Sequence, residues 1–219
     1  MRCFAHRGFA GENPENTVVA VERALRAGAD GIEVDVRRCA SGELVVIHDE
    51  TVDRVTDQSG RVRDLSLSTL RSLEVLGTGA GVPALADVVA TVPPDVVLNV
   101  ELKETGLAED LLSTVAASDP SILVSSFEAA ALREVAALSD VPLGLLCYDP
   151  RDEIETARDL GCEAIHPNER FCDERAVERA HEAGLSVNAW TGRSEQTADR
   201  LASAGVDGLI VDAPAYCRR

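Results

Sequence analysis

Scarce, chemically reactive residues close several short apolar runs of this 219-residue chain. His6 and His48, two of only four histidines, each end such a run, and Lys103, the only lysine, ends another. Carboxylates such as Glu33 and Asp35 occupy corresponding positions. If the runs are neighbouring strands, their ends bring together acid–base groups, carboxylates and a cation, which is the set that cleavage of a phosphodiester requires.

Glu33 and Asp35 are separated by one residue on a predicted strand, whose period of two points both carboxylates to one face. Two buried like charges are costly unless a cation or a proton lies between them, and a bound metal is the simplest resolution. Glu101, on the next strand of the predicted barrel, supplies a further oxygen. The all-oxygen set predicts one hard divalent cation, Mg²⁺ or Ca²⁺. The alternative is that Arg37 or Arg38 neutralises the pair.

Lys103 follows Glu101 by two residues, so its ammonium is predicted to lie on the same face as the metal ligands. A phosphate oxygen of a substrate is its expected partner, because the chain avoids lysine everywhere else. A structural salt bridge to Glu101, Glu33 or Asp35 is the alternative.

His6 and His48 are predicted to face each other across the mouth of the fold, one as a general base and the other as a general acid. Histidine can take and return a proton near neutral pH, and each role is worth roughly 10²- to 10⁴-fold in rate. Arg7 offers a planar fork to phosphate oxygens, and Gly8 permits close approach of the backbone. A lone histidine is more often a hydrogen-bonded core residue, but this pair in this setting favours catalysis.

Other polar and aromatic residues are weaker candidates. Glu15 and Asn16 precede Thr17 and are assigned to substrate binding, although Asn or Thr there is also an ordinary helix N-cap. Trp190, the only tryptophan, ends a predicted strand and is also assigned to the substrate, although it could simply fill the barrel. His166 ends another strand and is a candidate pocket residue.

Apolar, β-branched runs alternate with amphipathic runs along the whole chain. Eight runs predict strands, near residues 2–6, 31–36, 97–103, 122–126, 143–147, 163–167, 186–191 and 208–212. Helical patterns lie between them, at Thr17–Ala27, Leu107–Ala117, Glu128–Leu138, Asp152–Leu160, Asp173–Ala183 and Ser194–Ala204. Glycines typical of helix ends follow several of them, namely Gly28, Gly161, Gly184 and Gly205. Repeated units of this kind predict an α/β fold, a (β/α)8 TIM barrel, in one domain over residues 1–219.

One further apolar run, residues 44–47, lies too close to the second strand for a parallel crossover. It predicts an antiparallel hairpin that extends the second strand past the barrel mouth and returns His48 to the rim. Residues from about 50 to 84 are predicted to be a polar excursion with a weak helix near 66–73. The whole insertion, about 37–84, is expected to form a short loop over the mouth.

Carboxylates dominate the charge of the chain, with 38 Asp and Glu against 21 Lys and Arg and a formal net charge of −17. Such a surface opposes binding to a phosphate backbone, so no nucleic-acid partner is expected. The near absence of lysine and the few aromatic residues favour a halophilic host with high internal salt. A GC-rich genome, which also favours arginine over lysine, is the alternative explanation.

The cysteines and the apolar segments bear on the compartment. Six cysteines lie far apart without zinc-binding spacing, and reduced, buried thiols are favoured over disulfides. No segment resembles a signal peptide or a membrane span. A cytoplasmic protein with no stable membrane association is therefore expected, and its oligomeric state is left open.

Taken together, the motifs resemble those of the glycerophosphodiester phosphodiesterase family, within the phospholipase C-like phosphodiesterase superfamily. The motifs are His6-Arg7-Gly8, Glu15-Asn16-Thr17, Gly31–Val36, Val45–Asp49, Asn99–Lys103, Ser125-Ser126-Phe127, Trp190-Thr191, Gly205–Gly208 and Asp212-Ala213-Pro214. The resemblance spans the chain, and several ordered motifs at suitable spacing are far more specific than any one of them.

The resemblance implies a (β/α)8 barrel that hydrolyses glycerophosphodiesters to an alcohol and glycerol phosphate, and the short insertion suggests an open pocket and a small soluble diester. The implied roles are binding of one divalent cation by Glu33, Asp35 and Glu101, acid–base catalysis by His6 and His48, and phosphate binding by Arg7 and Lys103. Two alternatives stay open, a related barrel phosphodiesterase acting on a lysophospholipid or phosphoinositide, and a non-catalytic barrel that binds a phosphate ligand. The sequence does not identify the leaving alcohol, nor whether a neighbouring hydroxyl or water attacks phosphorus.

Overall fold

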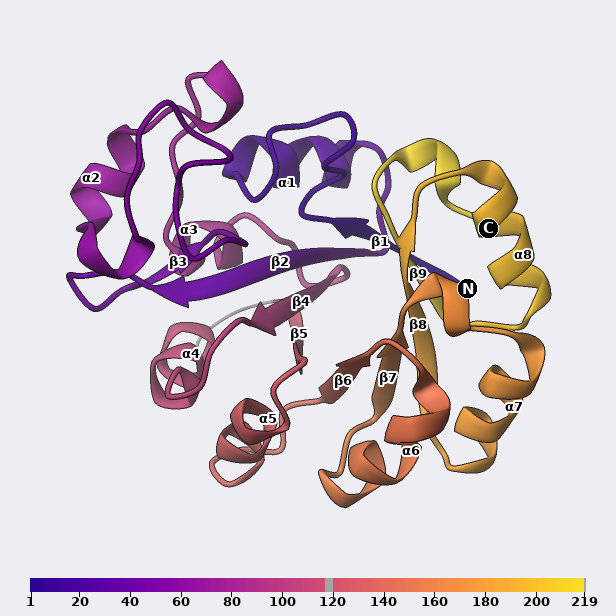
Figure 1. The fold of residues 1–219 in the computed structure, drawn as a ribbon. Coiled ribbons are helices and arrows are strands. Elements are labelled where there is room, and N and C mark those ends of the chain that lie inside the picture. The colour runs from indigo at the N-terminus through magenta and orange to yellow at the C-terminus, as the bar shows by residue number, and fades with distance from the viewer. Residues whose placement is uncertain (117–119, 219) are drawn as a thin grey trace.

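Eight parallel strands close into a barrel in the computed structural model, which describes residues 1–116 and 120–218 (Figure 1). The barrel strands are β1 (Arg2–His6), β2 (Gly31–Arg38), β4 (Val97–Leu102), β5 (Ser121–Ser126), β6 (Leu143–Cys147), β7 (Ala164–Pro167), β8 (Ser186–Gly192) and β9 (Gly208–Val211). Pairing of β1 with both β2 and β9 closes the ring. The predicted TIM barrel and its eight strands are thus confirmed.

Helices lie on the outer side of the barrel, except α2 (Leu67–Ser72), which belongs to the insertion (Figure 1). They are α1 (Val18–Arg26), α2 (Leu67–Ser72), α3 (Leu85–Val89), α4 (Ala108–Val115), α5 (Ala129–Ala136), α6 (Pro150–Asp159), α7 (Glu174–Glu182) and α8 (Glu195–Ser203). Four of these helices, α1, α6, α7 and α8, each end two residues before one of the glycines predicted to follow a helix end. The predicted end of one helix at Ala117 lies outside the described residues, and α3 is not predicted from the sequence because its apolar run is short.

The register of the strands brings the reactive side chains to one level of the barrel. His6 is the neighbour of Glu33 across β1 and β2, and Asp35 is the neighbour of Glu101 across β2 and β4. Because side chains alternate along a strand, all four belong to the set that points into the barrel at the carboxyl ends of the strands. Parallel barrels place their functional sites at this end.

The predicted hairpin is present as β3 (Leu44–Val46), which pairs antiparallel with β2 and places Val46 beside Val36. The segment that follows differs from the polar excursion expected from the sequence. It has its own buried apolar cluster, formed by Cys39, Val45, Ile47, Val52, Val55, Val62, Leu70, Leu73, Val75 and Val82. This cluster gives the insertion a defined shape beside the barrel, where α2 and β3 lie at one edge in Figure 1.

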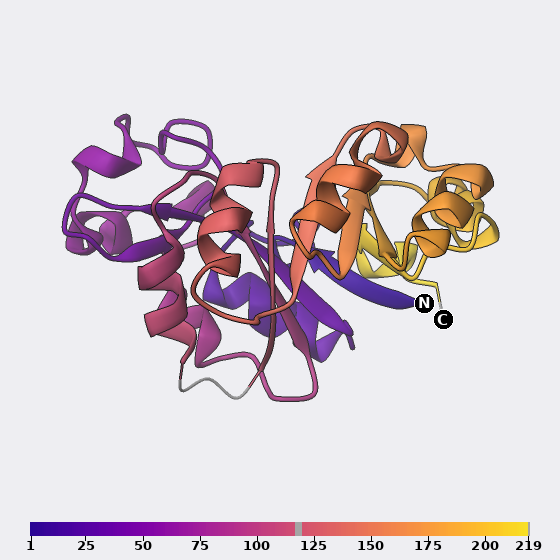
Figure 2. The same ribbon diagram turned by 90° about the horizontal axis from the view of Figure 1, so that it is seen from below.

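The cysteines require a correction, because Cys3 and Cys217 form a disulfide. The other four, Cys39, Cys147, Cys162 and Cys172, are free and buried, as expected. The disulfide joins β1 to the C-terminal segment, and the two chain ends lie side by side in Figure 2. The positions of these residues, 214 apart in sequence, give no signal of the pairing. No helix in the described part of the chain has the length and apolar character needed to cross a bilayer.

Reduction of this disulfide is expected to lower the free energy of unfolding by about 2–4 kcal/mol, because a cross-link across nearly the whole chain restricts the unfolded state. Denaturant unfolding with and without a phosphine reductant measures the effect. The double variant Cys3→Ser/Cys217→Ser is the control and should unfold alike under both conditions. Six rather than four titratable thiols in the unfolded, unreduced protein would show that the pair does not form.

Candidate active site

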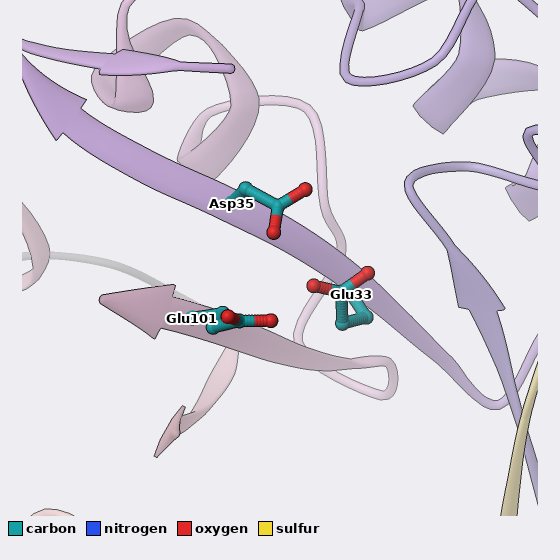
Figure 3. Close-up of side chains that lie close together, drawn as sticks. All are labelled: Glu33, Asp35 and Glu101. Atoms are coloured by element: carbon teal, nitrogen blue, oxygen red, sulfur yellow. The ribbon is translucent and has the colours of Figure 1, made fainter. Parts of the chain in front are cut away.

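Three carboxylates converge inside the barrel at its carboxyl end. Glu33 and Asp35 project from β2 and Glu101 from β4, and the three side chains point toward one another in Figure 3. One oxygen from each lies within 4.8 Å of the others. All three residues are buried, with 3%, 0% and 8% of their surfaces exposed. The predicted carboxylate set is therefore assembled as the strand period requires.

Burial shapes the electrostatics of this triad. Burial and the neighbouring charge of Asp35 raise the pKa of Glu33 well above its usual value. For Glu101, the same two causes outweigh the attraction of Lys103 and raise its pKa to about 7. Although burial opposes it, the cations of Arg7 and Lys103 lower the pKa of Asp35. Like charges held together away from water call for a proton or a cation.

The donor set fits a hard divalent cation. Glu33 Oε1 is buried without a hydrogen-bond partner among the described residues, and Asp35 Oδ1, also without a hydrogen bond, has an ion-pair contact with Lys103 Nζ at 3.3 Å. Such oxygens are rarely left unsatisfied in native interiors, and carboxylate oxygens are the ligands of Mg²⁺ and Ca²⁺. Arg37 and Arg38, the cations considered as an alternative, instead pair with carboxylates outside the triad.

Lys103 contacts the triad directly. Its Nζ lies 2.5 Å from Glu101 Oε1 and 3.3 Å from Asp35 Oδ1. The salt bridge considered as an alternative to phosphate binding is thus present in this structure. The salt bridge does not exclude phosphate binding by Lys103, because this residue also lines the cavity above the carboxylates.

Asn16 orients Asp35. Its side-chain amide donates to Asp35 Oδ2 at 2.8 Å, and its oxygen accepts from the Asp35 backbone N–H at 3.3 Å. The residue is buried and its φ is +58°. Thr17, not Asn16, is the N-cap of α1. The sequence assigns Asn16 to substrate binding, but in this structure it contacts a metal-ligand candidate.

His6 is held by a carboxylate that the sequence alone does not single out. His6 Nδ1 lies 2.5 Å from Asp212 Oδ1, and Asp212 also accepts from Arg193 Nε at 2.7 Å. Because an ionised carboxylate only accepts, Nδ1 carries the proton and Nε2 is left free to accept one. His6 Nε2 lies 4.0 Å from Glu33 Oε2, on the side of the triad. Asp212 thus fixes the tautomer and the direction of the ring.

Substitution Asp212→Asn is expected to lower kcat by roughly 10²-fold, because an amide in place of the carboxylate no longer fixes the imidazole tautomer or stabilises its protonated form. KM should change much less, since Asp212 does not line the cavity. Steady-state kinetics and thermal unfolding, measured together, separate this effect from a loss of folding. Wild-type kcat in a folded Asp212→Asn protein would contradict the assignment.

His48 is held in the same way through a longer network. His48 Nδ1 lies 2.5 Å from Asp49 Oδ1, and Arg54 Nε binds Asp49 Oδ2 at 2.5 Å. The Arg54 guanidinium also donates twice to Glu15, at 2.8 Å each. Burial, which outweighs the attraction of Asp35, lowers the pKa of His48. Arg54 belongs to the insertion, so this segment helps to position the second histidine.

Arg7 connects the two parts of the site. Its NH1 group donates to Glu15 at 3.0 Å, and its Nε lies 3.0 Å from Asp35 Oδ2. Gly8 is expected from the sequence to admit a ligand, but the close approach is to α1. A Cβ on Gly8 would lie 2.6 Å from the Cβ of Ala20, and φ is +77° there. Glycine is therefore required for packing of the loop on the helix.

A cavity opens above the triad, and its volume is about 490 Å³ when the space open to solvent at its mouth is included. Its lining includes the sequence-assigned residues His6, Arg7, Glu33, His48, Glu101, Lys103 and Trp190. The lining also includes Asn99, Phe127, Leu146, Thr191, Arg193 and Ile210, to which the sequence assigns no role. Glu15 and Asn16 lie behind this wall. Glu15 accepts a hydrogen bond from Arg7, and Asn16 donates one to Asp35, so neither side chain lies at the cavity surface.

The barrel interior around the triad is polar. Asn99 is buried with neither amide atom bonded, and the Ser125 hydroxyl and His166 Nδ1 also lack partners in the described part of the chain. Burial lowers the pKa of His166 to about 4, so its ring is neutral near pH 7. His166 is fully buried and does not line the cavity, contrary to the expectation from its place at a strand end. Its backbone oxygen accepts from Trp190 Nε1 at 2.7 Å.

Comparison with known proteins identifies this arrangement. A model of the Glycerophosphoryl diester phosphodiesterase family matches residues 6–216, a range that includes every residue of the cavity wall. The chain belongs to this family. A glycerophosphodiester phosphodiesterase of Caldanaerobacter subterraneus subsp. tengcongensis is 34% identical over 227 residues, covering 96% of this chain and 93% of the relative. One of Bacillus altitudinis is 32% identical, covering 97% and 95%.

Solved structures of glycerophosphodiester phosphodiesterases and related enzymes share the fold. An Oleispira antarctica phosphodiesterase, solved in complex with the product sn-glycerol-3-phosphate, has a TM-score of 0.91 at 28% identity and covers 98% of this chain and 94% of that one. The enzyme of Thermotoga maritima has a TM-score of 0.85 at 27% identity, with 98% and 95% covered. The protein is therefore a phosphoric diester hydrolase, with the glycerophosphodiester phosphodiesterase activity that defines its family.

Proposed function

We propose that this enzyme hydrolyses small glycerophosphodiesters to an alcohol and glycerol phosphate, with His6 and His48 as the acid–base pair. One observation carries the proposal. Both histidines line the cavity above the carboxylate triad, and the Nδ1 atom of each lies 2.5 Å from an aspartate oxygen. Each therefore presents Nε2 as its reactive nitrogen, which is the arrangement that proton transfer in two directions needs.

In the proposed reaction one imidazole accepts a proton from the attacking hydroxyl as its oxygen forms a bond to phosphorus. The other, protonated, gives its proton to the leaving oxygen as the second P–O bond breaks. The two histidines then exchange states through water, and the cycle is balanced. The attacking group is either the neighbouring glycerol hydroxyl, followed by opening of a cyclic phosphate by water, or water itself.

The phosphate is held from two sides in this proposal. Arg7 and Lys103 line the cavity next to the triad. Burial alone would lower the pKa values of these two cations, but the charge of Asp35 and of other nearby carboxylates raises them, so both side chains stay cationic. A divalent cation, Mg²⁺ or Ca²⁺, held by Glu33, Asp35 and Glu101 would act as a Lewis acid on a phosphate oxygen. Arg7 and Lys103 would then share the remaining negative charge.

A small soluble substrate is favoured over the two alternatives. The homologous phosphodiesterase of Oleispira antarctica was solved with sn-glycerol-3-phosphate, which is the product expected here. The anionic headgroup of a phosphoinositide, or an anionic membrane surface, would favour a basic rim, whereas this chain has a net charge of −17. A barrel that only binds phosphate would be expected to lack one of the two histidines or three carboxylates, and all are present.

The test is release of glycerol phosphate from a panel of glycerophosphodiesters in molar KCl, with EDTA and then with Mg²⁺ or Ca²⁺ restored. Release that needs the metal supports the proposal and ranks the alcohols. A folded, metal-loaded protein that cleaves no soluble diester would overturn it, and cleavage of lysophospholipid alone would favour the lipid alternative.

Chain closure, surface charge and the disulfide bear on the domain organisation and setting of the enzyme. One catalytic domain over residues 1–219 is consistent with a barrel that the first and last strands close together. High host salt is proposed from the acidic composition and predicts higher stability in molar KCl than at low salt. A cytoplasmic location is retained as a proposal, but the Cys3–Cys217 disulfide favours an oxidising compartment instead. Cell fractionation distinguishes the two.

A further inference from the structure

Three aromatic residues gather at the barrel mouth of a chain that has few of them. Phe127 follows β5, Tyr148 follows β6 and Trp190 lies in β8. Their ring centroids are 5.4 Å apart for Phe127 and Trp190, and 5.8 Å apart for each of the other two pairs. The chain has only one Trp, two Tyr and four Phe, so nearly half of its aromatic residues form one wall beside the catalytic cavity.

Two of these rings are turned toward solvent. Tyr148 is 64% exposed and Phe127 40% exposed, although large apolar rings are normally buried. Trp190 is half-buried and held by the bond from Nε1 to the His166 oxygen. An exposed aromatic wall on a rigid strand-end scaffold is a surface on which a ligand can pack.

A groove lies beside this wall, and its volume is about 730 Å³ when the space open to solvent is included. It shares Phe127 and Leu146 with the catalytic cavity, so the groove and the cavity are adjacent. Tyr148 lies along it, and a substrate whose phosphate occupies the cavity can therefore extend one of its ester groups into the groove.

The groove is acidic. Asp149, Asp152 and Glu153 line it, at the start of α6, and no basic side chain is part of its described lining. Asp149 caps α6 and binds Arg151 at 3.0 Å, whereas the negative charges of Asp152 and Glu153 are not matched by any basic residue of the groove wall. Burial, and then the charges of Glu153 and Asp149, raise the pKa of the nearby Cys147 thiol. The groove lining therefore carries an excess of acidic side chains.

We propose that this groove binds the alcohol part of the substrate and selects alcohols that carry a quaternary ammonium group. The inference rests on the proposed function and adds the class of leaving alcohol to it. Aromatic faces attract an alkylated ammonium through their quadrupoles, and nearby carboxylates add a longer-range attraction. A neutral apolar alcohol would use the rings but gain nothing from the carboxylates, and an anionic one would be repelled.

The experiment compares two diesters of equal shape. Glycerophosphocholine and its neutral analogue with a 3,3-dimethylbutyl ester differ in one charge. We expect kcat/KM to favour the choline ester by about tenfold at low salt, with the ratio falling as salt screens the carboxylates. Tyr148→Leu and the double variant Asp152→Asn/Glu153→Gln should each bring the ratio toward one. Asp159→Asn, at the far end of the same helix, is the matched control and should keep the ratio.

Fluorescence gives a second readout that does not depend on turnover. Trp190 is the only tryptophan and is part of the wall, so both choline and 3,3-dimethylbutanol should change its emission, and choline should do so at a concentration about tenfold lower. Equal kcat/KM values for the two esters, or variants that lower both equally, would overturn the inference. Cleavage of both esters without preference would leave the proposed function standing, whereas a folded enzyme that cleaves neither ester nor any other soluble diester would remove both.

Discussion

Substitution of either active-site histidine is expected to lower kcat for a glycerophosphodiester by about 10²- to 10⁴-fold, because each supplies one of the two proton transfers. His6→Ala and His48→Ala should fold, since neither ring belongs to the apolar core. The double variant should lose little more than the worse single variant, because the two residues act as a unit. Steady-state kinetics on metal-loaded protein, with thermal unfolding in parallel, measures both properties.

His181→Ala is the matched control. This histidine is exposed on α7 and lies 2.8 Å from Asp207, with no contact to the cavity. Its removal should leave kcat within about twofold of the wild-type value, as expected for a surface position. If a folded His48→Ala protein kept most of the wild-type rate, the acid–base pair would be wrong, and another group of the cavity wall would have to transfer the second proton.

The barrel can be predicted because its determinants are local. Strands and helices of a parallel barrel alternate in sequence, and each apolar run carries its own period. The same regularity predicts that Glu33, Asp35 and Glu101 share one inner face. Even the antiparallel hairpin follows from the short distance between residues 38 and 44. In each case the information lies within a few residues of the element it determines.

Other features depend on contacts between distant parts of the chain. Asp212 reaches His6 across 206 residues, and Arg54 reaches Glu15 across 39. The Cys3–Cys217 disulfide needs closure of the whole barrel. The sequence identifies such residues only as members of a motif or as scattered charges, because their roles arise from tertiary geometry. For the same reason the motif that contains Glu15 does not reveal that its side chain lies behind the cavity wall.

Removal of the metal is expected to make the stability of the enzyme depend on pH between about 4.5 and 7. In the metal-free protein burial and Asp35 raise the pKa of Glu101 to about 7, so the folded state holds a proton that the unfolded state has released. The stability that the protonated Glu101 carboxyl provides is fully present below 4.5, its pKa in the unfolded chain, and is lost as the pH rises through about 7, its pKa in the folded protein. The shift from 4.5 corresponds to about 3 kcal/mol. The raised pKa of Glu33 acts in the same direction.

Unfolding in EDTA should therefore require less denaturant at pH 8 than at pH 5, and Mg²⁺ or Ca²⁺ should restore stability at pH 8 by binding the folded state. Glu101→Gln removes the titrating charge, so this variant should be more stable than the wild type in EDTA at pH 8 and gain less from the metal. The difference between the two proteins isolates the contribution of Glu101 from those of the other titrating groups. Equal pH dependence in the wild type and Glu101→Gln would show that the triad tolerates its charges without a cation, and the metal site would then lose its physical basis.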